Sequence, residues 1–287
     1  MNQSYLPDEI VISDDCSTDD TVKIIYSYAK KYNHITWKVI QSENNVGYIK
    51  NFLKAIQSTT EEIIILCDQD DLWDKDKIKF FKMCFETHKN MISLHTDYSI
   101  INKNGDILRE REIHYLRYIH KYNVKQFCKR LNYCGMSSAF HKCIKDDLLS
   151  INPDMILTHD WTIHALSVLN NGMYISNKVT SYRRYHENNV ALNFQKKVIR
   201  NGIIQRIDVI DNYIKYYILL DNLSKKFGKL DTDRDYYISK IIEINKNRIK
   251  YLSMRKIIKW IISIKNIIYY PSYRSYLCDF FYLCNIF

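Results

Sequence analysis

The sequence lacks the features that mark secreted, zinc-binding and membrane-spanning proteins. Its eight cysteines include no CxxC pair, and no signal peptide precedes them, so neither a zinc site nor a secreted disulfide framework is indicated. We therefore expect free thiols in a reducing cytoplasm. No apolar run reaches the length of a membrane span, because Lys265 interrupts the longest candidate. Proline is scarce, with three residues in 287, which reflects base-composition bias.

The composition instead indicates a folded chain whose charged residues are unevenly distributed along the sequence. With 287 residues, 46% of them hydrophobic, it can bury a substantial core as one large domain or as one domain with an appendage. Residues 196–287 hold 18 Lys/Arg against 8 Asp/Glu, whereas residues 1–195 hold 24 of each. We expect a domain over residues 1–195 and a basic helical region over residues 196–287, which face different partners.

The most informative stretch runs from Ile63 to Trp73, where an apolar run ends at three carboxylates within four positions. The run indicates a strand buried on both faces, as in the interior of a parallel sheet, and ligands bind at the carboxyl ends of such strands. Asp68, Asp70 and Asp71 would repel one another by roughly 1 to 4 kcal/mol per close pair. Mg²⁺ or Mn²⁺ would relieve that repulsion. The alternative is a solvated acidic turn that caps the next helix.

A second acidic cluster follows an earlier strand. Residues 9–13 form a short apolar strand that ends at Asp14 and Asp15, and helical spacing begins at Thr21. Strand and helix patterns then alternate as far as a strand over residues 91–95, which predicts an α/β fold with a parallel sheet and right-handed crossovers. Two acidic strand ends side by side favour a ligand-binding crevice.

This α/β pattern begins late in the sequence. A doubly wound unit normally begins with a strand and a helix before the strand at Glu9, yet eight residues precede that position. We therefore expect the first strand to be absent, which would leave an interior strand without one hydrogen-bonded neighbour.

Three later segments carry further candidate residues. Cys134–Phe140 gathers small residues, as expected where backbone approaches a ligand closely, although an ordinary turn into a strand explains it equally well. His159, Asp160 and Trp161 open a helical stretch that Thr158 can cap. The Asp160 carboxylate is explained either as a capping residue stabilised by the helix dipole or as a general base beside an aromatic wall.

A strand over residues 174–185 ends beside Arg184 and His186. Arginine and histidine together can hold phosphate, and histidine can also complete a metal shell. A lone histidine is more often a structural hydrogen-bonding residue, but this one follows two arginines.

The tail has helical periodicity over residues 197–227 and 233–252. A further amphipathic segment contains Trp260, and four isoleucines share one of its faces: Ile257, Ile261, Ile264 and Ile268. A basic segment of this kind can lie on an anionic membrane surface. Packing against the front domain or a partner is the alternative. The aliphatic content of the tail argues against nucleic acid as a partner.

Together these segments resemble family 2 glycosyltransferases, and most of all the bacterial rhamnosyltransferase-like branch. The resemblance covers roughly residues 5 to 192 and rests on five segments in the family's order: Asp14–Asp19, Asp68–Trp73, Cys134–Phe140, His159–Trp161 and Arg184–Asn189. It implies a GT-A fold, with a Rossmann-like, mostly parallel sheet flanked by helices and a C-terminal helical extension. It also implies inverting transfer of a sugar from a nucleotide diphosphate to a cell-surface polysaccharide, a glycan or a lipid-linked acceptor.

The resemblance also implies roles for the donor-side residues. Asp15 resembles the residue that contacts the nucleobase, with Asp14 beside it, and Asp68 resembles a residue that holds the ribose. Asp70 and Asp71 resemble ligands of a diphosphate-bound Mg²⁺ or Mn²⁺.

On the acceptor side, Asp160 occupies the position of the catalytic base, and His159 and Trp161 flank the acceptor. Gly135 lies in the loop that faces the donor sugar. The diphosphate or the metal would meet Arg184 and His186, of which His186 is the expected metal ligand.

Two departures from the family pattern accompany the match. The first strand and its loop are missing, and Thr162 replaces a second aromatic residue that often follows the Asp-Trp pair. One hypothesis is an active, metal-dependent glycosyltransferase at the cytoplasmic face of the membrane. The alternative is a truncated, catalytically impaired protein that binds nucleotide sugars or a partner. A metal-dependent phosphohydrolase or nuclease is a weaker third hypothesis, because no motif beyond the carboxylates supports it.

Overall fold

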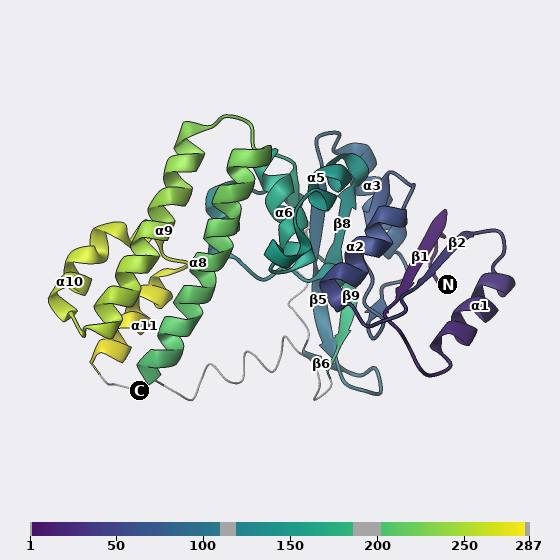
Figure 1. Cartoon of the computed structure of the whole chain (residues 1–287), viewed down its shortest axis with the longest axis horizontal. Helices are drawn as coiled ribbons and strands as arrows, with labels where there is room; N and C mark the ends of the chain where they lie inside the picture. Colours follow the sequence, from purple (N-terminus) through teal and green to yellow (C-terminus); the bar gives the residue numbers. More distant parts are fainter. Residues whose placement is uncertain (1, 110–118, 186–201, 285–287) are drawn as a thin grey trace. The chain divides into compact units, whose positions relative to one another are not determined.

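The computed structural model describes residues 2–109, 119–185 and 202–284 and divides into two compact units (Figure 1). The first unit contains Met1–Lys121 and Tyr133–Arg184, and the second contains Tyr122–Asn132 and Tyr185–Phe287. A short internal segment therefore belongs with the C-terminal helices. The domain boundary predicted between residues 195 and 196 lies outside the described residues and stays a prediction.

The first unit begins with a small parallel sheet. Strand β1 (Glu9–Asp14) pairs with β2 (Thr36–Gln41), so that Glu9 lies opposite Thr36. Helix α1 (Thr21–Lys31) connects them and buries no side chain fully, whereas α2 (Tyr48–Ser58), which follows β2, buries Leu53 and Ile56. The strand predicted over residues 9–13 and the helix predicted from Thr21 are both present.

A larger sheet has the strand order β3-β8-β5-β9-β4, with β6 paired to β5 and β7 paired to β9. The strands are β3 (Ile63–Ile65), β4 (Leu72–Trp73), β5 (Ser93–Ile101), β6 (Ile107–Arg109), β7 (Ile119–Lys121), β8 (Ser138–His141) and β9 (Met173–Arg184).

This sheet is mixed, which corrects the expectation of a mostly parallel one. Among the described strands, only β5 and β9 run parallel in it, and β3, β4, β6, β7 and β8 pair in antiparallel fashion. The run at Ile63 is also not flanked by parallel strands, because β3 ends the strand order of the described residues and pairs with β8. An apolar run reports burial and carries no information about strand direction, so the sequence pattern fitted either arrangement.

Helices pack onto this sheet and fix the segments that carry candidate residues. The helical elements are α3 (Lys77–Thr87), η1 (Gly135–Ser137), η2 (Lys142–Ile144), α5 (Lys145–Leu149), η3 (Pro153–Met155) and α6 (His159–Leu169). Phe80, Phe81 and Cys84 of α3 pack with Leu94 of β5 and Ala139 of β8.

Helix α6 is held to the sheet by a buried polar network. His164 Nδ1 and Nε2 lie 2.9 Å from the hydroxyl oxygens of Ser93 and Ser138, respectively. At the start of the helix, the side chain of Thr158 caps α6 by accepting the Trp161 N–H at 3.4 Å, as predicted. The start of α6, which carries Asp160, therefore has a fixed position relative to β5 and β8.

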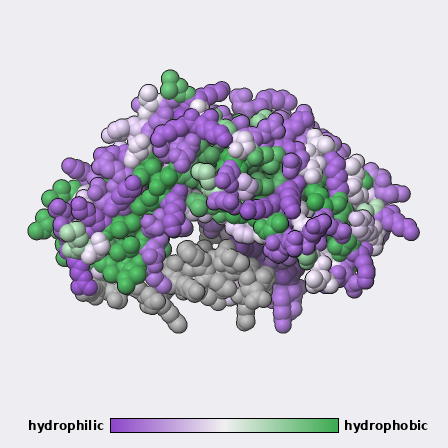
Figure 2. Space-filling model, viewed as in Figure 1, coloured by the Kyte–Doolittle hydropathy of each residue, from purple (hydrophilic) through white to green (hydrophobic). Residues whose placement is uncertain are grey.

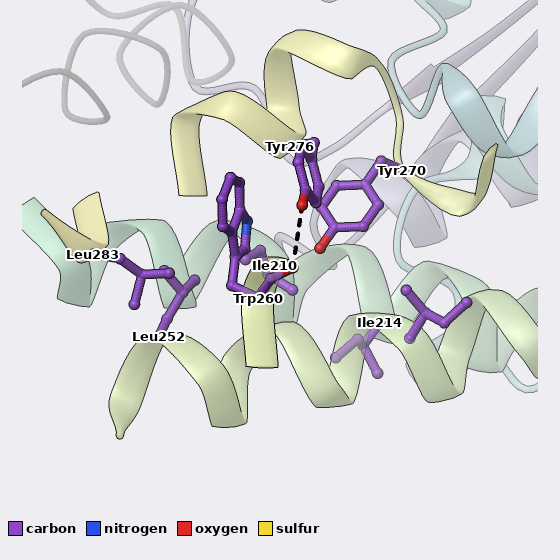
Figure 3. Close-up of a cluster of buried hydrophobic side chains, with 8 residues drawn as sticks. Ile210, Ile214, Leu252, Trp260, Tyr270, Tyr276 and Leu283 are labelled. Atoms are coloured by element: carbon purple, nitrogen blue, oxygen red, sulfur yellow. Dashed lines mark hydrogen bonds between the residues drawn. The ribbon is translucent and has the colours of Figure 1, made fainter. Parts of the chain in front are cut away.

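The second unit is helical. It consists of α4 (Val124–Lys129), α8 (Gly202–Phe227), α9 (Thr232–Ser253), α10 (Ile257–Ile262), η4 (Ser263–Tyr269) and α11 (Tyr273–Leu283). The Tyr217 hydroxyl of α8 donates to the Cys128 carbonyl of α4 at 2.9 Å. Figure 3 shows the core, where Trp260 stacks on Tyr276 with ring centroids 4.3 Å apart and Tyr276 Oη donates to the Trp260 carbonyl at 3.1 Å.

A buried ion cluster joins three of these helices. Arg248 of α9 is 1% exposed and donates to both oxygens of Asp279 on α11, at 2.8 and 3.2 Å. Arg206 of α8 donates to the same carboxylate at 2.8 Å. Breaking such a cluster costs more than breaking a surface pair, because the remaining charges stay buried.

The segment after α9 departs from the sequence expectation in one respect. Trp260 is 7% exposed and belongs to the core, so it cannot lie on a membrane surface. Isoleucines around it are exposed, with Ile258 at 74%, Ile262 at 60% and Ile268 at 61%, and Figure 2 shows hydrophobic side chains on the surface at the α10 end. Among the described residues, no helix is both long and apolar enough to cross a membrane.

Candidate active site

The acidic loop between β3 and β4 is fixed by the end of β9. The Arg184 N–H donates to Asp71 Oδ1 at 2.9 Å, and Arg184 Nε donates to the Asp70 carbonyl at 3.1 Å. Leu72 pairs with Tyr182 across the β4–β9 ladder. The loop therefore does not act as a free acidic turn, because its backbone and one carboxylate are bound to another strand.

Negative charge is concentrated at Asp68. Burial, together with the carboxylates of Asp71, Asp160 and Asp70, raises its pKa to about 6, and the Arg183 guanidinium opposes them. Burial also raises the pKa of Asp71. Asp160 follows Asp68 by more than ninety positions in the sequence, so the fold brings two of the predicted acidic segments into electrostatic contact.

A buried lysine lies beneath this loop, on α3. Lys77 is fully buried, its Nζ lies 3.9 Å from the centre of the Trp73 ring, and it donates to Ser181 Oγ at 2.9 Å and to the Met136 carbonyl. Burial lowers its pKa to about 7, although Asp68 and Asp71 act in the opposite direction. Lys77 was not predicted from the sequence, because a lysine within a charged helix is normally solvated.

Asp160 lies in the first turn of α6, against the loop that contains Gly135. A Cβ atom at Gly135 would lie 3.3 Å from His159 Nε2 and 3.7 Å from Asp160 Cβ. Asp160 Oδ1 also accepts the Trp161 N–H at 2.7 Å. The loop that contains Gly135 therefore lies against the start of α6, and a larger side chain at this position would press on His159. The predicted approach of this loop to a ligand stays a prediction.

His159 is buried without a hydrogen-bond partner at either ring nitrogen. Its ring is 5% exposed and stacks on Phe52 of α2, with centroids 4.0 Å apart. Burial lowers the pKa of His159 in spite of the adjacent Asp160 carboxylate. An imidazole in this environment is neutral at pH 7, and its unpartnered nitrogens cost stability.

The other acidic pair organises loops around β1. Asp14 is 7% exposed and accepts the N–H and hydroxyl of Ser17. Asp15 accepts the N–H groups of Val46 and Gly47 at 2.7 and 2.9 Å. Asp15 therefore fixes the loop that leads into α2, the helix whose Phe52 stacks on His159.

Comparison with known sequences identifies the family. The sequence pattern of glycosyl transferase family 2 matches residues 1–148, just over half of the chain. The chain belongs to glycosyl transferase family 2. This confirms the family resemblance deduced from the five motifs.

Two curated relatives illustrate how far the match extends. The dTDP-rhamnosyl transferase RfbG of Shigella flexneri is 27% identical to this family 2 chain over 226 residues, which cover 71% of the chain and 73% of RfbG. An uncharacterized protein of Mycobacterium tuberculosis is 35% identical over 80 residues, which cover 28% of the chain and 22% of that relative. The match therefore spans only about a fifth of the second protein.

Solved structures confirm the α/β, GT-A-like fold. Staphylococcus aureus TarS 1–349 in complex with UDP-GlcNAc aligns with a TM-score of 0.59 and 18% identity, covering 85% of this chain and 65% of TarS 1–349. The mannosyltransferase PcManGT from Pyrobaculum calidifontis, in complex with GDP-Man and Mn²⁺, aligns with a TM-score of 0.51 and 15% identity, covering 97% of this chain and 67% of PcManGT.

Two predicted site residues, Trp161 and Arg184, contact other parts of the protein. Trp161 is 1% exposed, so its ring packs in the core, and its role beside the acceptor stays a prediction. The Arg184 Nη1 atom donates to the carbonyls of Asn102 and Lys103 at 3.2 and 2.7 Å. Arg184 therefore connects the acidic loop to the turn after β5. His186 lies outside the described residues.

Arg183 also acts on the acidic loop, although the sequence pointed to its neighbour Arg184. The charge of Arg183 opposes the rise in the pKa of both Asp68 and Asp71, and its Nη1 donates to Cys134 Sγ at 3.8 Å. Arg184 contacts the same loop by hydrogen bonds to Asp71 and to the Asp70 carbonyl. Both arginines therefore meet the acidic loop, Arg183 through its charge and Arg184 through hydrogen bonds.

The carboxylates of the acidic loop suit a divalent cation that is bound together with the phosphates of a substrate. Within the described part of the chain, no three His, Cys, Asp or Glu side chains are gathered into a metal site. Mg²⁺, however, is usually held by one or two carboxylates together with substrate phosphates. Burial and the repulsion among the carboxylates raise the pKa of Asp68, and a cation between the loop and a diphosphate would relieve the repulsion.

Proposed function

We propose that this family 2 chain transfers a sugar, with inversion, from a nucleotide-diphosphate donor to a glycan or lipid-linked acceptor of cell-surface polysaccharide. The observation that carries the proposal is the electrostatic interaction between the carboxylates of Asp68 and Asp160, which come from segments distant in sequence. One carboxylate belongs to the acidic loop and the other to the start of α6, so the pair suits a site with a donor side and an acceptor side.

Asp160 is proposed as the general base. Inverting transfer requires a base that takes the proton of the acceptor hydroxyl while its oxygen attacks the anomeric carbon from the face opposite the diphosphate. The carboxylate lies at the first turn of a helix held to the sheet by His164, and a fixed base loses less entropy on reaching the reactive geometry. Gly135 supports this role by allowing close approach of the donor-side loop.

The acidic loop is proposed to hold the diphosphate through a cation. Asp70 and Asp71 would hold Mg²⁺ or Mn²⁺, with His186 as a further ligand, and the cation would offset the charge of the leaving diphosphate. Arg183 would contribute a second positive charge, since it already acts on Asp68 and Asp71. Asp14 and Asp15 are proposed at the nucleobase, where Asp15 orders the Val46–Gly47 turn.

The donor is best sought among three nucleotide classes. RfbG is a dTDP-rhamnosyl transferase, TarS was solved with UDP-GlcNAc, and PcManGT with GDP-Man. We propose one of these classes for this chain. The test is a panel of UDP-, dTDP- and GDP-sugars with Mn²⁺ or Mg²⁺, in which release of the nucleoside diphosphate and binding of each donor are measured in parallel.

The expected result is saturable, cation-dependent binding of one donor class and its turnover when an acceptor is supplied. Binding of one class without any turnover would favour a second candidate, a protein that binds nucleotide sugars without transferring them. The engagement of Arg184 with backbone carbonyls is the observation that favours this candidate, since it removes one expected phosphate ligand. Failure to bind any of the three classes would contradict both.

For the second unit we propose contact with an anionic membrane surface through α10 and η4. Ile258, Ile262 and Ile264 are exposed by 74, 60 and 58%, and the exposed Lys259 and Lys265 lie among them, a combination suited to the interface of an anionic bilayer. Sedimentation with vesicles containing phosphatidylserine tests it. We expect salt-sensitive binding that Ile258→Glu weakens and that vesicles of phosphatidylcholine alone do not reproduce; equal binding to both vesicles would contradict it.

A further inference from the structure

Lys77 is a buried cation to which the proposed transfer assigns no role. It opens helix α3 and is fully buried, whereas a lysine is almost never fully buried unless it is paired with an opposite charge. Its hydrogen-bond partners are neutral groups, the Ser181 hydroxyl and the Met136 carbonyl. Burial of an ammonium group against neutral partners costs free energy, and burial lowers the pKa of Lys77 to about 7. A charge placed at such a cost is a candidate for a functional role.

The ammonium group of Lys77 lies where three segments of the first unit meet. The first segment is β4, directly after the acidic loop, where Nζ lies 3.9 Å from the centre of the Trp73 ring. The second is η1, which we call the Gly135 turn, whose Met136 carbonyl accepts a hydrogen bond from Nζ. The third is β9, whose Ser181 Oγ accepts another at 2.9 Å. One side chain therefore contacts all three segments.

The contacts of Lys77 add the Gly135 turn to an arrangement that the backbone already provides. Trp73 and Ser181 are partners in the β4–β9 ladder, so these two strands keep their register without Lys77. The Ser181 hydroxyl donates to the Met136 carbonyl at 3.0 Å. Lys77, Ser181 and Met136 thus form a closed triangle of hydrogen bonds, which joins the turn to the two strands.

The segments that meet at this triangle carry opposite sides of the proposed site. Trp73 follows Asp71 by two positions, and Asp71 belongs to the donor side. Met136 follows Gly135, at which a Cβ atom would lie 3.7 Å from Asp160 Cβ, so the turn lies against the residue proposed as the base. A shift of the turn relative to the acidic loop would therefore change the distance between the donor-side carboxylates and Asp160.

We propose that Lys77 is a positioning residue, whose ammonium group holds the Gly135 turn at a fixed distance from the acidic loop and so sets the separation of Asp71 and Asp160. The inference rests on the proposed glycosyl transfer, in which these two carboxylates act on the donor and on the acceptor. Because Lys77 is fully buried, it acts through them and not by contact with a substrate. Its charge also opposes the rise in the pKa of Asp71, which favours the ionised carboxylate that a cation needs.

The test compares Lys77→Met with Lys79→Met, which makes the same change on the exposed side of the same helix. Methionine fills most of the space of the lysine side chain but supplies neither charge nor donor, and the Ser181 hydroxyl keeps the Met136 carbonyl paired. We therefore expect Lys77→Met to fold with a melting temperature close to that of the wild type.

The kinetic readout separates turnover from nucleotide binding. With a donor that the wild type uses, Lys77→Met should lower kcat by roughly ten- to a hundredfold, because small misplacements of reacting groups are costly, while its affinity for the nucleoside diphosphate changes by less than about threefold. Lys79→Met should match the wild type in both quantities. Ser181→Ala, which removes one corner of the triangle, should give a smaller fall in kcat, again without loss of nucleotide affinity.

Hydrogen exchange measured without substrate tests the arrangement itself. Amide exchange reports local opening. Lys77→Met should speed exchange in the Gly135 turn and in residues 70–73, and leave exchange in α8 of the other unit unchanged.

Wild-type kcat in Lys77→Met would overturn the proposal, and so would a nucleotide affinity that falls in parallel with kcat, since the residue would then support the structure in general. Unchanged exchange in both segments would overturn it as well. If Lys77→Met failed to fold, wild-type kcat in Ser181→Ala would still count against the proposal. A wild type that transferred no sugar, with exchange raised in both segments of Lys77→Met, would refute the proposed function and support the arrangement assigned to Lys77.

Discussion

Replacing Asp68 by asparagine should stabilise the chain when no divalent cation is present. Burial and the nearby carboxylates raise the pKa of Asp68 from 3.8 to about 6, a rise of about 2, and each step of one in pKa corresponds to about 1.4 kcal/mol. The ionised side chain therefore destabilises the folded state by at most about 3 kcal/mol. Because Asp68 keeps some contact with solvent, we expect about 1 to 2 kcal/mol.

The effect should depend on pH in a defined direction. The folded protein binds a proton at Asp68 more tightly than the unfolded chain does, so the wild type loses stability as pH rises from about 4 to about 6. Above that window the carboxylate is ionised in both states, and the penalty is complete. The advantage of Asp68→Asn should therefore be largest at pH 7 to 8 and shrink toward zero near pH 4.

Urea unfolding in EDTA between pH 4.5 and 8 measures this difference. Asp146→Asn, the same chemical change at an exposed position of α5, serves as the matched control. A gain in unfolding free energy that is independent of pH would refute the electrostatic reasoning. So would a loss of stability at pH 7.5, since it would mean that the ionised carboxylate stabilises the folded state.

Further predictions concern the rest of the site and the second unit. His159→Phe should preserve or raise the melting temperature, because it removes two buried nitrogens without partners, yet lower turnover; unchanged turnover would remove His159 from the site. Gly135→Ala should reduce turnover about tenfold by pushing on His159 and Asp160, and a kinetically silent variant would contradict that contact. Excess EDTA should weaken donor binding if Asp70 and Asp71 hold a cation, and calorimetric titration with unaltered affinity would argue against it. Asp279→Ala should destabilise by about 3 to 5 kcal/mol, because two arginines lose their partner in the core, whereas Asp211→Ala, which breaks an exposed pair, should cost under about 1 kcal/mol; equal costs in urea unfolding would refute the argument.

Local pattern was sufficient to predict most elements of the first unit. The apolar strands and the helical spacing at Thr21 lie where the structure has β1, α1 and β3, because short-range periodicity reflects which side chains are buried. Strand direction was not predictable in this way. The pairing of β3 with β8 joins residues more than seventy positions apart, and no periodicity encodes such a pairing.

The carboxylates of the candidate site were predictable from the sequence, because such side chains can bind a metal or accept a proton. Asp68 and Asp160 were named from the sequence, and their charges interact in the structure. Lys77 and Arg183 were missed for a different reason. The position of Lys77 depends on which face of α3 is buried. Arg183 acts through its charge on Asp68 and Asp71, and the distance between these charges depends on the tertiary fold.

The most direct test of the central claim compares transfer with nucleotide binding in Asp160→Asn, with Asp146→Asn as the control. If Asp160 is the base, the asparagine variant should lose turnover by roughly a hundredfold or more while its affinity for the nucleoside diphosphate stays within about a factor of two or three. Loss of nucleotide affinity in parallel with turnover, or turnover close to that of the control, would contradict the assignment.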